Sequence, residues 1–262
     1  MRAYVEFAVK KFQNNMAYRF EHLMGILNTI LTFFVFWCIY RSLYGKANEV
    51  DGITFSMVVT NFIIALGLSN AFTIDEGFIE RKVWDGTIVN EFLKPVNYKI
   101  RILSEDLGNS LFRVVFNFIP ALLIAILFTN IEKPSSFLNL IFFTISIILG
   151  YLILWTLSFI VQMGSFWFFG VWGLTTIKNV FVNVLSGAMI PLWFMPKWIM
   201  DIIKYTPFDS IYFTPIKLYL GQMKGSEILF NFGRQAIWVF TFYVLGDILW
   251  RRGQKKLIVQ GG

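Results

Sequence analysis

The chain has 262 residues, of which 56% are hydrophobic and only 15% are charged. Soluble domains carry about a quarter of charged residues, so this balance excludes a globule with a polar surface and indicates that most of the surface meets lipid. The net charge of +7 comes from basic residues between apolar runs. That distribution is typical of membrane topology signals and gives no reason to expect a nucleic-acid partner.

The residues that usually carry chemistry are scarce. Cys38 is the single cysteine and His22 the single histidine, so no internal disulfide and no His/Cys metal site is expected. No glycine-rich phosphate loop, Ser-His-Asp set or metal-ligand cluster occurs. We therefore expect no catalytic site and no cofactor bound by this chain.

Residues 1–20 form a predicted amphipathic helix in the membrane interface. With 3.6 residues per turn, one face of this helix is apolar and carries Val5, Ala8, Val9, Phe12 and Met16. The other face is polar and carries Arg2, Glu6, Lys10, Gln13 and Asn14. Such a helix lies in the plane of the interface, either as a simple anchor or as a link between the first span and a cytoplasmic partner. It begins well before the first apolar run, so no cleavable signal peptide is expected.

Six apolar runs are long enough to cross a bilayer, which takes about 20 residues. The predicted spans are Leu23–Tyr40, Ile53–Ile74, Val114–Ile131, Phe137–Val161, Leu174–Met195 and Ile228–Trp250. The fourth and fifth are separated at 162–173, where glycines and aromatic residues predict an interfacial turn. Most of the 23 lysines and arginines fall on the side of the two termini. The prediction is thus an all-α integral membrane protein, one transmembrane domain over 1–262, with both termini cytoplasmic.

The cytoplasmic loop at 75–109 contains a predicted short helix between Val83 and Pro95. Asp85 or Thr87 can cap its first turn, and Pro95 ends it. The apolar residues of this helix lie in a segment outside the lipid; they are Ile88, Val89, Phe92 and Leu93. Exposed apolar residues on such a helix favour docking into a groove of another protein. The alternative is that they pack under the chain's own bundle.

The long outer loop, from Pro191 to Gly233, combines prolines with apolar segments too short to span. Four of the seven prolines of the chain fall in it, and they are Pro191, Pro196, Pro207 and Pro215. Irregular backbone at membrane depth must be buried in protein or face a water-filled cavity. We expect short re-entrant helices at 196–227 and an outer lid.

Asp247 is the one acidic residue within a predicted span. An ion pair with Arg251, four residues later, is one interpretation. The other is a coupling-ion site, for which the membrane-edge Glu105 and Asp106 are further candidates. With no ionisable residue in the cores of the first five spans, energy for transport is expected from a separate partner.

Two motifs resemble a known family. The run from Asp85-Gly86-Thr87 to Leu93-Lys94-Pro95-Val96 resembles the cytoplasmic loop of ABC-2 type transporter permeases. Ser186-Gly187, Ile190-Pro191 and Phe194…Pro196 resemble the end of the fifth span in the same family. The resemblance is closest to the six-span subfamily found beside drug- and antibiotic-export ATPases in bacteria. It covers nearly the whole chain, and the order and spacing of the motifs carry it.

The resemblance implies a permease subunit of an exporter in the bacterial cytoplasmic membrane. Two permeases, identical or related, would each dock on one of two ABC ATPase subunits, which bind ATP and Mg²⁺. The implied docking residues are Asp85, Gly86, Thr87, Ile88, Val89, Phe92, Leu93, Lys94 and Pro95. The cargo, a drug, antibiotic, peptide or lipid-like molecule, would pass between the second and fifth spans of the two permeases. The implied contact residues there are Gly67, Ser69, Ser186, Gly187 and Ala188. The alternatives are an ion-coupled secondary transporter and a scaffold protein without transport activity.

Overall fold

The computed structural model describes residues 2–17, 19–168 and 170–256, and nearly all of their regular structure is helical. The first half of the chain forms α1 (Arg2–Asn15), α2 (Arg19–Tyr44), β1 (Glu49–Val50), β2 (Ile53–Thr54), α3 (Phe55–Ala71), α4 (Phe78–Trp84), α5 (Ile88–Phe92), α6 (Tyr98–Arg113), the π-helical η1 (Val114–Phe118) and α7 (Ile119–Phe128). The second half forms α8 (Phe137–Met163), η2 (Gly164–Phe166), α9 (Trp172–Leu185), η3 (Leu192–Phe194), α10 (Lys197–Ile203), α11 (Phe213–Tyr219) and α12 (Ser226–Lys256).

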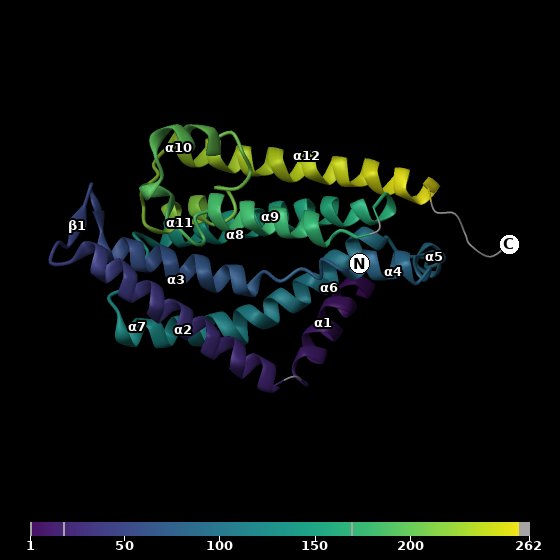
Figure 1. The fold of residues 1–262 in the computed structure, drawn as a ribbon, viewed down its shortest axis with the longest axis horizontal. Coiled ribbons are helices and arrows are strands. Elements are labelled where there is room, and N and C mark those ends of the chain that lie inside the picture. The colour runs from purple at the N-terminus through teal and green to yellow at the C-terminus, as the bar shows by residue number, and fades with distance from the viewer. Residues whose placement is uncertain (1, 18, 169, 257–262) are drawn as a thin grey trace.

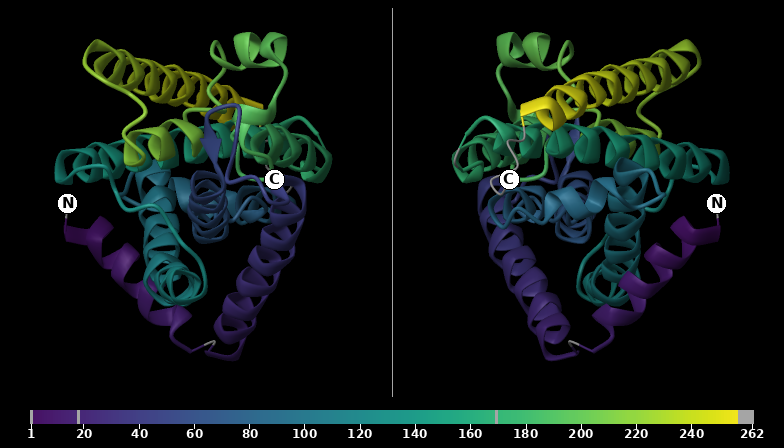
Figure 2. Two further views of the ribbon diagram at one scale, coloured as in Figure 1. Left: turned by 90° about the vertical axis from the view of Figure 1, so that its left-hand side faces the viewer. Right: turned by 90° about the vertical axis from the view of Figure 1, so that its right-hand side faces the viewer.

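The long helices run along one axis and leave two distinct ends (Figure 1). One end, which we call the α4–α5 end, carries these two short helices together with the end of α12. The opposite end, the hairpin end, carries β1, α10 and α11. Along the axis, α3 lies in the middle of the bundle, while α1 and α2 form a V at one edge and α12 lies at the other (Figure 2).

Four helical stretches of the described chain are long and apolar enough to cross a membrane. They are Phe20–Tyr44, Tyr98–Phe128, Phe137–Phe166 and Ser226–Lys256. Helix α3 is apolar but has only 17 residues, and α9 has 14. The prediction of an all-α membrane protein is confirmed, and the fourth predicted span begins where α8 begins, at Phe137, with the Ser136 hydroxyl accepting a hydrogen bond from the Asn139 amide at 3.1 Å.

The third span is longer than predicted. The helix does not begin at Val114 but at Tyr98, and continues through α6, η1 and α7 to Phe128. Its start is set by Asn97, whose side chain accepts a hydrogen bond from the Ile100 amide at 3.1 Å. The π segment lies directly before Pro120, where the missing N–H of proline interrupts regular α-helical bonding.

The fifth span is shorter than predicted. Helix α9 ends at Leu185 rather than near Met195. The cause is Gly187, whose φ of +80° lies in the left-handed region that glycine adopts without strain. Its neighbour Ser186 turns its carbonyl toward the Phe213 amide, which donates a hydrogen bond of 3.1 Å.

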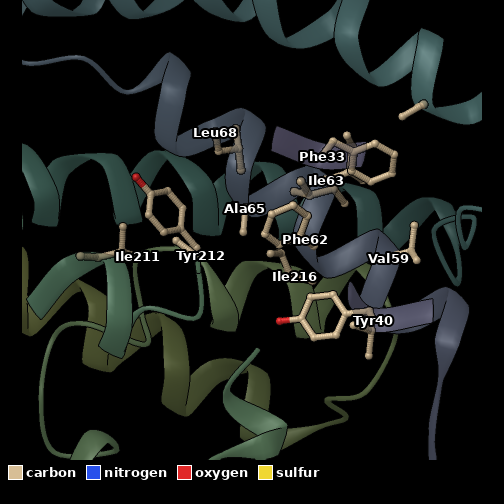
Figure 3. Close-up of a cluster of buried hydrophobic side chains, with 14 of the residues drawn as sticks. Phe33, Tyr40, Val59, Phe62, Ile63, Ala65, Leu68, Ile211, Tyr212 and Ile216 are labelled. Carbon is tan, nitrogen blue, oxygen red and sulfur yellow. The ribbon is translucent and has the colours of Figure 1, made fainter. Parts of the chain in front are cut away.

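Buried aromatic and aliphatic side chains of α2, α3 and α11 form the core at the centre of the bundle (Figure 3). Phe62 of α3 lies between Phe33 and Tyr40 of α2, with ring centroids 6.4 and 6.2 Å away. On its other side, α11 contributes Ile216, which is fully buried. Helix α3 is therefore covered on most sides by other helices of the chain, and α11 at the hairpin end is buried in protein.

Helix α1 packs on α6 with part of its apolar face. The Phe12 ring lies 5.3 Å from that of Phe112. Gly108 of α6 approaches the backbone of α1 so closely that a Cβ there would lie 2.2 Å from the Ala8 carbonyl oxygen. The remaining apolar residues of α1, Val5, Val9 and Met16, stay exposed. The predicted amphipathic helix therefore divides its apolar face between α6 and the surroundings.

Candidate functional site

The segment 75–97 at the α4–α5 end folds as two short helices rather than the single helix predicted from Val83 to Pro95. Between them, Gly86 has a φ of +66°, which breaks the helix. Asp85 caps the C-terminal end of the first helix and donates its amide to the Arg81 carbonyl. Thr87 precedes the second helix, but its side chain makes no capping hydrogen bond. Neither predicted N-cap is therefore used.

The apolar residues of this segment separate into a buried and an exposed set. Ile88 is 0% exposed and packs in a cluster with Ile79 and Trp155 of α8, with Val89 packed against the cluster. For Ile88 the prediction of an exposed docking residue was wrong, and the alternative of packing under the bundle holds. Leu93 is 78% exposed, as a docking residue would be, and its docking role stays a prediction. The side chain of Phe92 lies outside the described residues.

A buried carboxylate braces the second short helix. Glu91 is 4% exposed and accepts hydrogen bonds from Lys82, from Arg101 and, at 2.9 Å, from Lys94. Burial alone would raise the pKa of Glu91. The hydrogen bonds from the two lysines and the positive charge of Arg101 outweigh burial, so the pKa lies below its ordinary value. This cluster fixes α5 to both α4 and α6.

The braced segment also contacts the long helices directly. The Ile79 amide donates to Gln162 of α8 at 3.4 Å, and Glu80 accepts from the Val171 amide, just before α9, at 3.3 Å. Tyr98, which follows the segment, stacks on Trp250 of α12 with ring centroids 4.8 Å apart. Any displacement of this segment must therefore reach α6, α8, α9 and α12.

The carboxylates considered for ion coupling all have partners. Asp247 pairs with Arg251 at 2.8 Å, as the ion-pair interpretation predicts, and also with Lys99 at 3.5 Å. Glu105 pairs with Arg101 at 2.8 Å, and Asp106 accepts from the Trp155 indole at 2.9 Å. Over residues 2–17, 19–168 and 170–256, no group of three or more His, Cys, Asp or Glu side chains is arranged to hold a metal ion.

The small residues expected between two permeases make their close contacts within this chain. A Cβ at Gly67 would lie 2.1 Å from the Phe118 ring. Ser69 donates its hydroxyl to the Leu66 carbonyl, and the Gly187 carbonyl accepts from Asn61 at 3.3 Å. Ser186 and Ala188 are buried beside them. The small side chains thus allow neighbouring helices of one chain to approach, and neighbouring helices cover most of them here.

Helix α9 has the opposite character. Of its 14 described residues, only Lys178 and Val182 are buried. Its exposed side chains include the polar Thr176 and Asn183, seven residues apart and so on one face. Polar residues on an exposed face of a helix among membrane spans call for a protein partner or a water-filled space. The seven-residue spacing of Thr176 and Asn183 is visible in the sequence, but the sequence prediction for this helix considered only small residues.

At the hairpin end, Arg234 of α12 holds the proline-rich loop in place. Its guanidinium donates to Asp209 at 2.7 Å, to the Lys204 carbonyl at 2.6 Å and to Asn231 at 2.9 Å. The predicted lid prolines are Pro191, Pro207 and Pro215, which are buried, and Pro196, which is exposed before α10. A cavity of about 550 Å³ lies between α10, α11 and α12.

The long apolar helices define the class of this molecule as a multi-pass membrane protein. A family model described as ABC-2 family transporter protein matches residues 26–261, and the chain belongs to this family. Membership implies association with an ABC ATPase and with the lipid bilayer. The membrane permeases of this family are generally non-catalytic. Comparisons with curated proteins and with solved structures found no match.

Proposed function

We propose that the chain is the membrane subunit of an ATP-driven exporter and that a separate ATPase docks on segment 75–97. The observation that carries the proposal is the combination of an exposed Leu93 with a buried Glu91 cluster directly behind it. Exposed apolar side chains on a rigid support are suited to docking. Trp84, at the end of the neighbouring helix and 53% exposed, extends the same surface.

We further propose six membrane crossings, with α3 and α9 as the two short ones. At 1.5 Å per residue, helices of 17 and 14 residues measure about 25 and 21 Å. Helix α3 is extended by partly buried non-helical chain at 72–74, and α9 by buried chain at 186–188, where such backbone is tolerated. Six crossings put both termini and segment 75–97 in the cytoplasm. The buried α11 and the neighbouring α10 then form the re-entrant part of an outer lid.

The cargo route in this proposal runs along α9. Two permeases, identical or related, face each other there, and each binds one of two ATPase subunits that hold ATP and Mg²⁺. The exposed Asn183 supports this choice because its amide calls for a polar neighbour, whereas the Thr176 hydroxyl donates to the Trp172 carbonyl of its own helix at 2.9 Å. The family favours a drug, antibiotic, peptide or lipid-like cargo leaving a bacterial cell across its cytoplasmic membrane.

Purification of the tagged chain from its native membrane in mild detergent tests the proposal. We expect an ATPase with a phosphate-binding loop to copurify. Leu93→Asp should reduce its recovery at least tenfold, because a charge replaces an exposed apolar contact. Tyr205→Asp, equally exposed at the hairpin end, is the matched control and should retain the ATPase. Ile88 is unsuitable for this test because its burial makes any charge there a folding defect.

Two results would contradict the proposal. Transport driven by an ion gradient, without an ATPase and lost in Asp247→Asn, would establish a secondary transporter. If no ATPase copurifies with the parent chain, and Leu93→Asp leaves the cellular function of the chain unchanged, the chain is a scaffold or another class of protein.

A further inference from the structure

A buried ion pair connects segment 75–97 to α9. Lys178 is the only charged residue in the sequence of α9, and its side chain is 5% exposed. Its ammonium group pairs with Glu76 and donates to the Ser158 hydroxyl of α8 at 2.8 Å. Glu76 lies in the short connection between α3 and α4, at the beginning of segment 75–97.

Both oxygens of Glu76 are engaged by α9. One oxygen binds Lys178, and the other accepts a hydrogen bond from the Asn179 amide group at 3.1 Å. Two adjacent residues of one helix therefore hold a single carboxylate. Such a two-point contact fixes the helix against both rotation and sliding relative to the carboxylate, which a single contact cannot do.

The contact gains importance from how little else holds α9. Lys178 and Val182 are its only buried residues among the 14 described. The second polar contact, from the Val171 amide to Glu80, lies just before the helix begins. Glu76 and Glu80 both belong to the stretch around α4, so the described polar contacts of the first half of α9 lead mainly to the docking segment.

Because it is largely removed from water, this ion pair is stable only when both of its members are in place. A charge removed from water is tolerated only with its partner in place, so loss of either member leaves an uncompensated charge. An exposed pair, such as Arg2 and Glu6 one turn apart on α1, is screened by solvent and contributes little.

We propose that Glu76 and Lys178 act as a transmission latch, which passes movement of the ATPase-docking segment to α9. This inference rests on the proposed function. It assigns Glu76 and Lys178 a positioning role, since neither needs to touch cargo or nucleotide. Ser158 and Asn179 position the two charged side chains, because Ser158 accepts a hydrogen bond from Lys178 and Asn179 donates one to Glu76.

The test uses the complex of the full chain with its copurifying ATPase. A single reporter cysteine replaces Asn183, which is exposed on α9, in a Cys38→Ser background. The labelling rate with N-ethylmaleimide is measured without nucleotide and with ATP, Mg²⁺ and orthovanadate. With the latch intact, we expect nucleotide to change the rate at least threefold.

Glu76→Gln and Lys178→Met should each abolish that change while ATPase binding and ATP hydrolysis persist. Exchange of the two charges, Glu76→Lys with Lys178→Glu, should restore it at least in part. The double variant Glu76→Gln with Lys178→Met has no unpaired charge, so it is expected to fold even if a single variant does not, and it should lack the response. Glu6→Gln is the matched control and should respond normally.

A nucleotide response that persists in the folded double variant would overturn the latch. Loss of ATPase binding in that variant would also overturn it, because Glu76 would then belong to the docking surface. Failure of the parent chain to bind any ATPase would instead overturn the proposed function, so the two failures are distinguishable.

Discussion

Glu91 shows how a single residue sets the pH range in which the docking segment is stable. Its pKa is lowered in the folded chain, so the ionised form is the one that binds Lys82, Lys94 and Arg101. A lowered carboxyl pKa contributes stability above the ordinary value, about 4.3, and this stability is lost as the pH falls through the lowered pKa.

We therefore expect Glu91→Gln to cost on the order of 1–3 kcal/mol at neutral pH, the cost of losing charge-assisted bonds that are partly open to solvent. The difference in thermal midpoint between the native chain and the variant should be constant from neutral pH to about 5 and shrink below about 4. A difference that does not change in acid would mean that the Glu91 charge does not hold the cluster.

Arg234 is the corresponding residue at the hairpin end. Arg234→Met leaves Asp209 buried without its charge partner, and we expect a loss of about 3–5 kcal/mol, read from thermal unfolding in detergent. Lys204→Met, which removes only an exposed pair with Asp201, should cost no more than about 1 kcal/mol. Equal losses in the two variants would argue against Arg234 as the residue that fixes the outer loop.

At the scale of elements, the attachment of α1 depends on Gly108. Because the α1 backbone occupies the space of a Cβ, Gly108→Val should separate α1 from α6. Trypsin should then cleave at Lys10 and Lys11 at least several-fold faster. Gly173→Val is the control, because a Cβ there meets no atom within 4 Å. Unchanged cleavage in Gly108→Val would show that α1 is not held by this contact.

The elements also show which parts of the fold can be predicted from the sequence. The start of the fourth span was predicted at Phe137, where α8 begins, because hydropathy is a local property of the sequence. The start of α6 was missed because the charged residues near it argue against a span; they are Lys99, Arg101, Glu105 and Asp106. The partners of Lys99 and Asp106, which are Asp247 and Trp155, are distant in sequence. The early end of α9 depends on one left-handed glycine, whose conformation no hydropathy pattern reveals.

The candidate site was predicted in position but not in detail. The composition of the loop pointed to segment 75–97, and the exposure of Leu93 was expected because the segment lies outside the lipid. The burial of Ile88 and the contacts of Glu76 with α9 depend on how α4 lies against α8 and α9. Those contacts join residues roughly 70–100 positions apart, and local patterns carry no information about them.

At the scale of the whole molecule, the two ends have different tasks. The α4–α5 end carries the braced segment 75–97, to which we assign docking, and the hairpin end closes the bundle with buried loops held by Arg234. Between them lies α9, which buries only Lys178 and Val182 and is bound in its first half to segment 75–97. This arrangement suits the proposed function, in which movement begins at the α4–α5 end and is passed to the weakly held α9.

The most direct test of this account is site-specific photo-crosslinking in the native membrane. A photoreactive amino acid replaces Leu93, and in a parallel chain it replaces Tyr205 at the hairpin end. Illumination should join the chain labelled at 93 to a soluble ATPase with a phosphate-binding loop, and the chain labelled at 205 should give no such product. Crosslinks to the ATPase from position 205, or none from 93 when the ATPase is present, would contradict docking at segment 75–97.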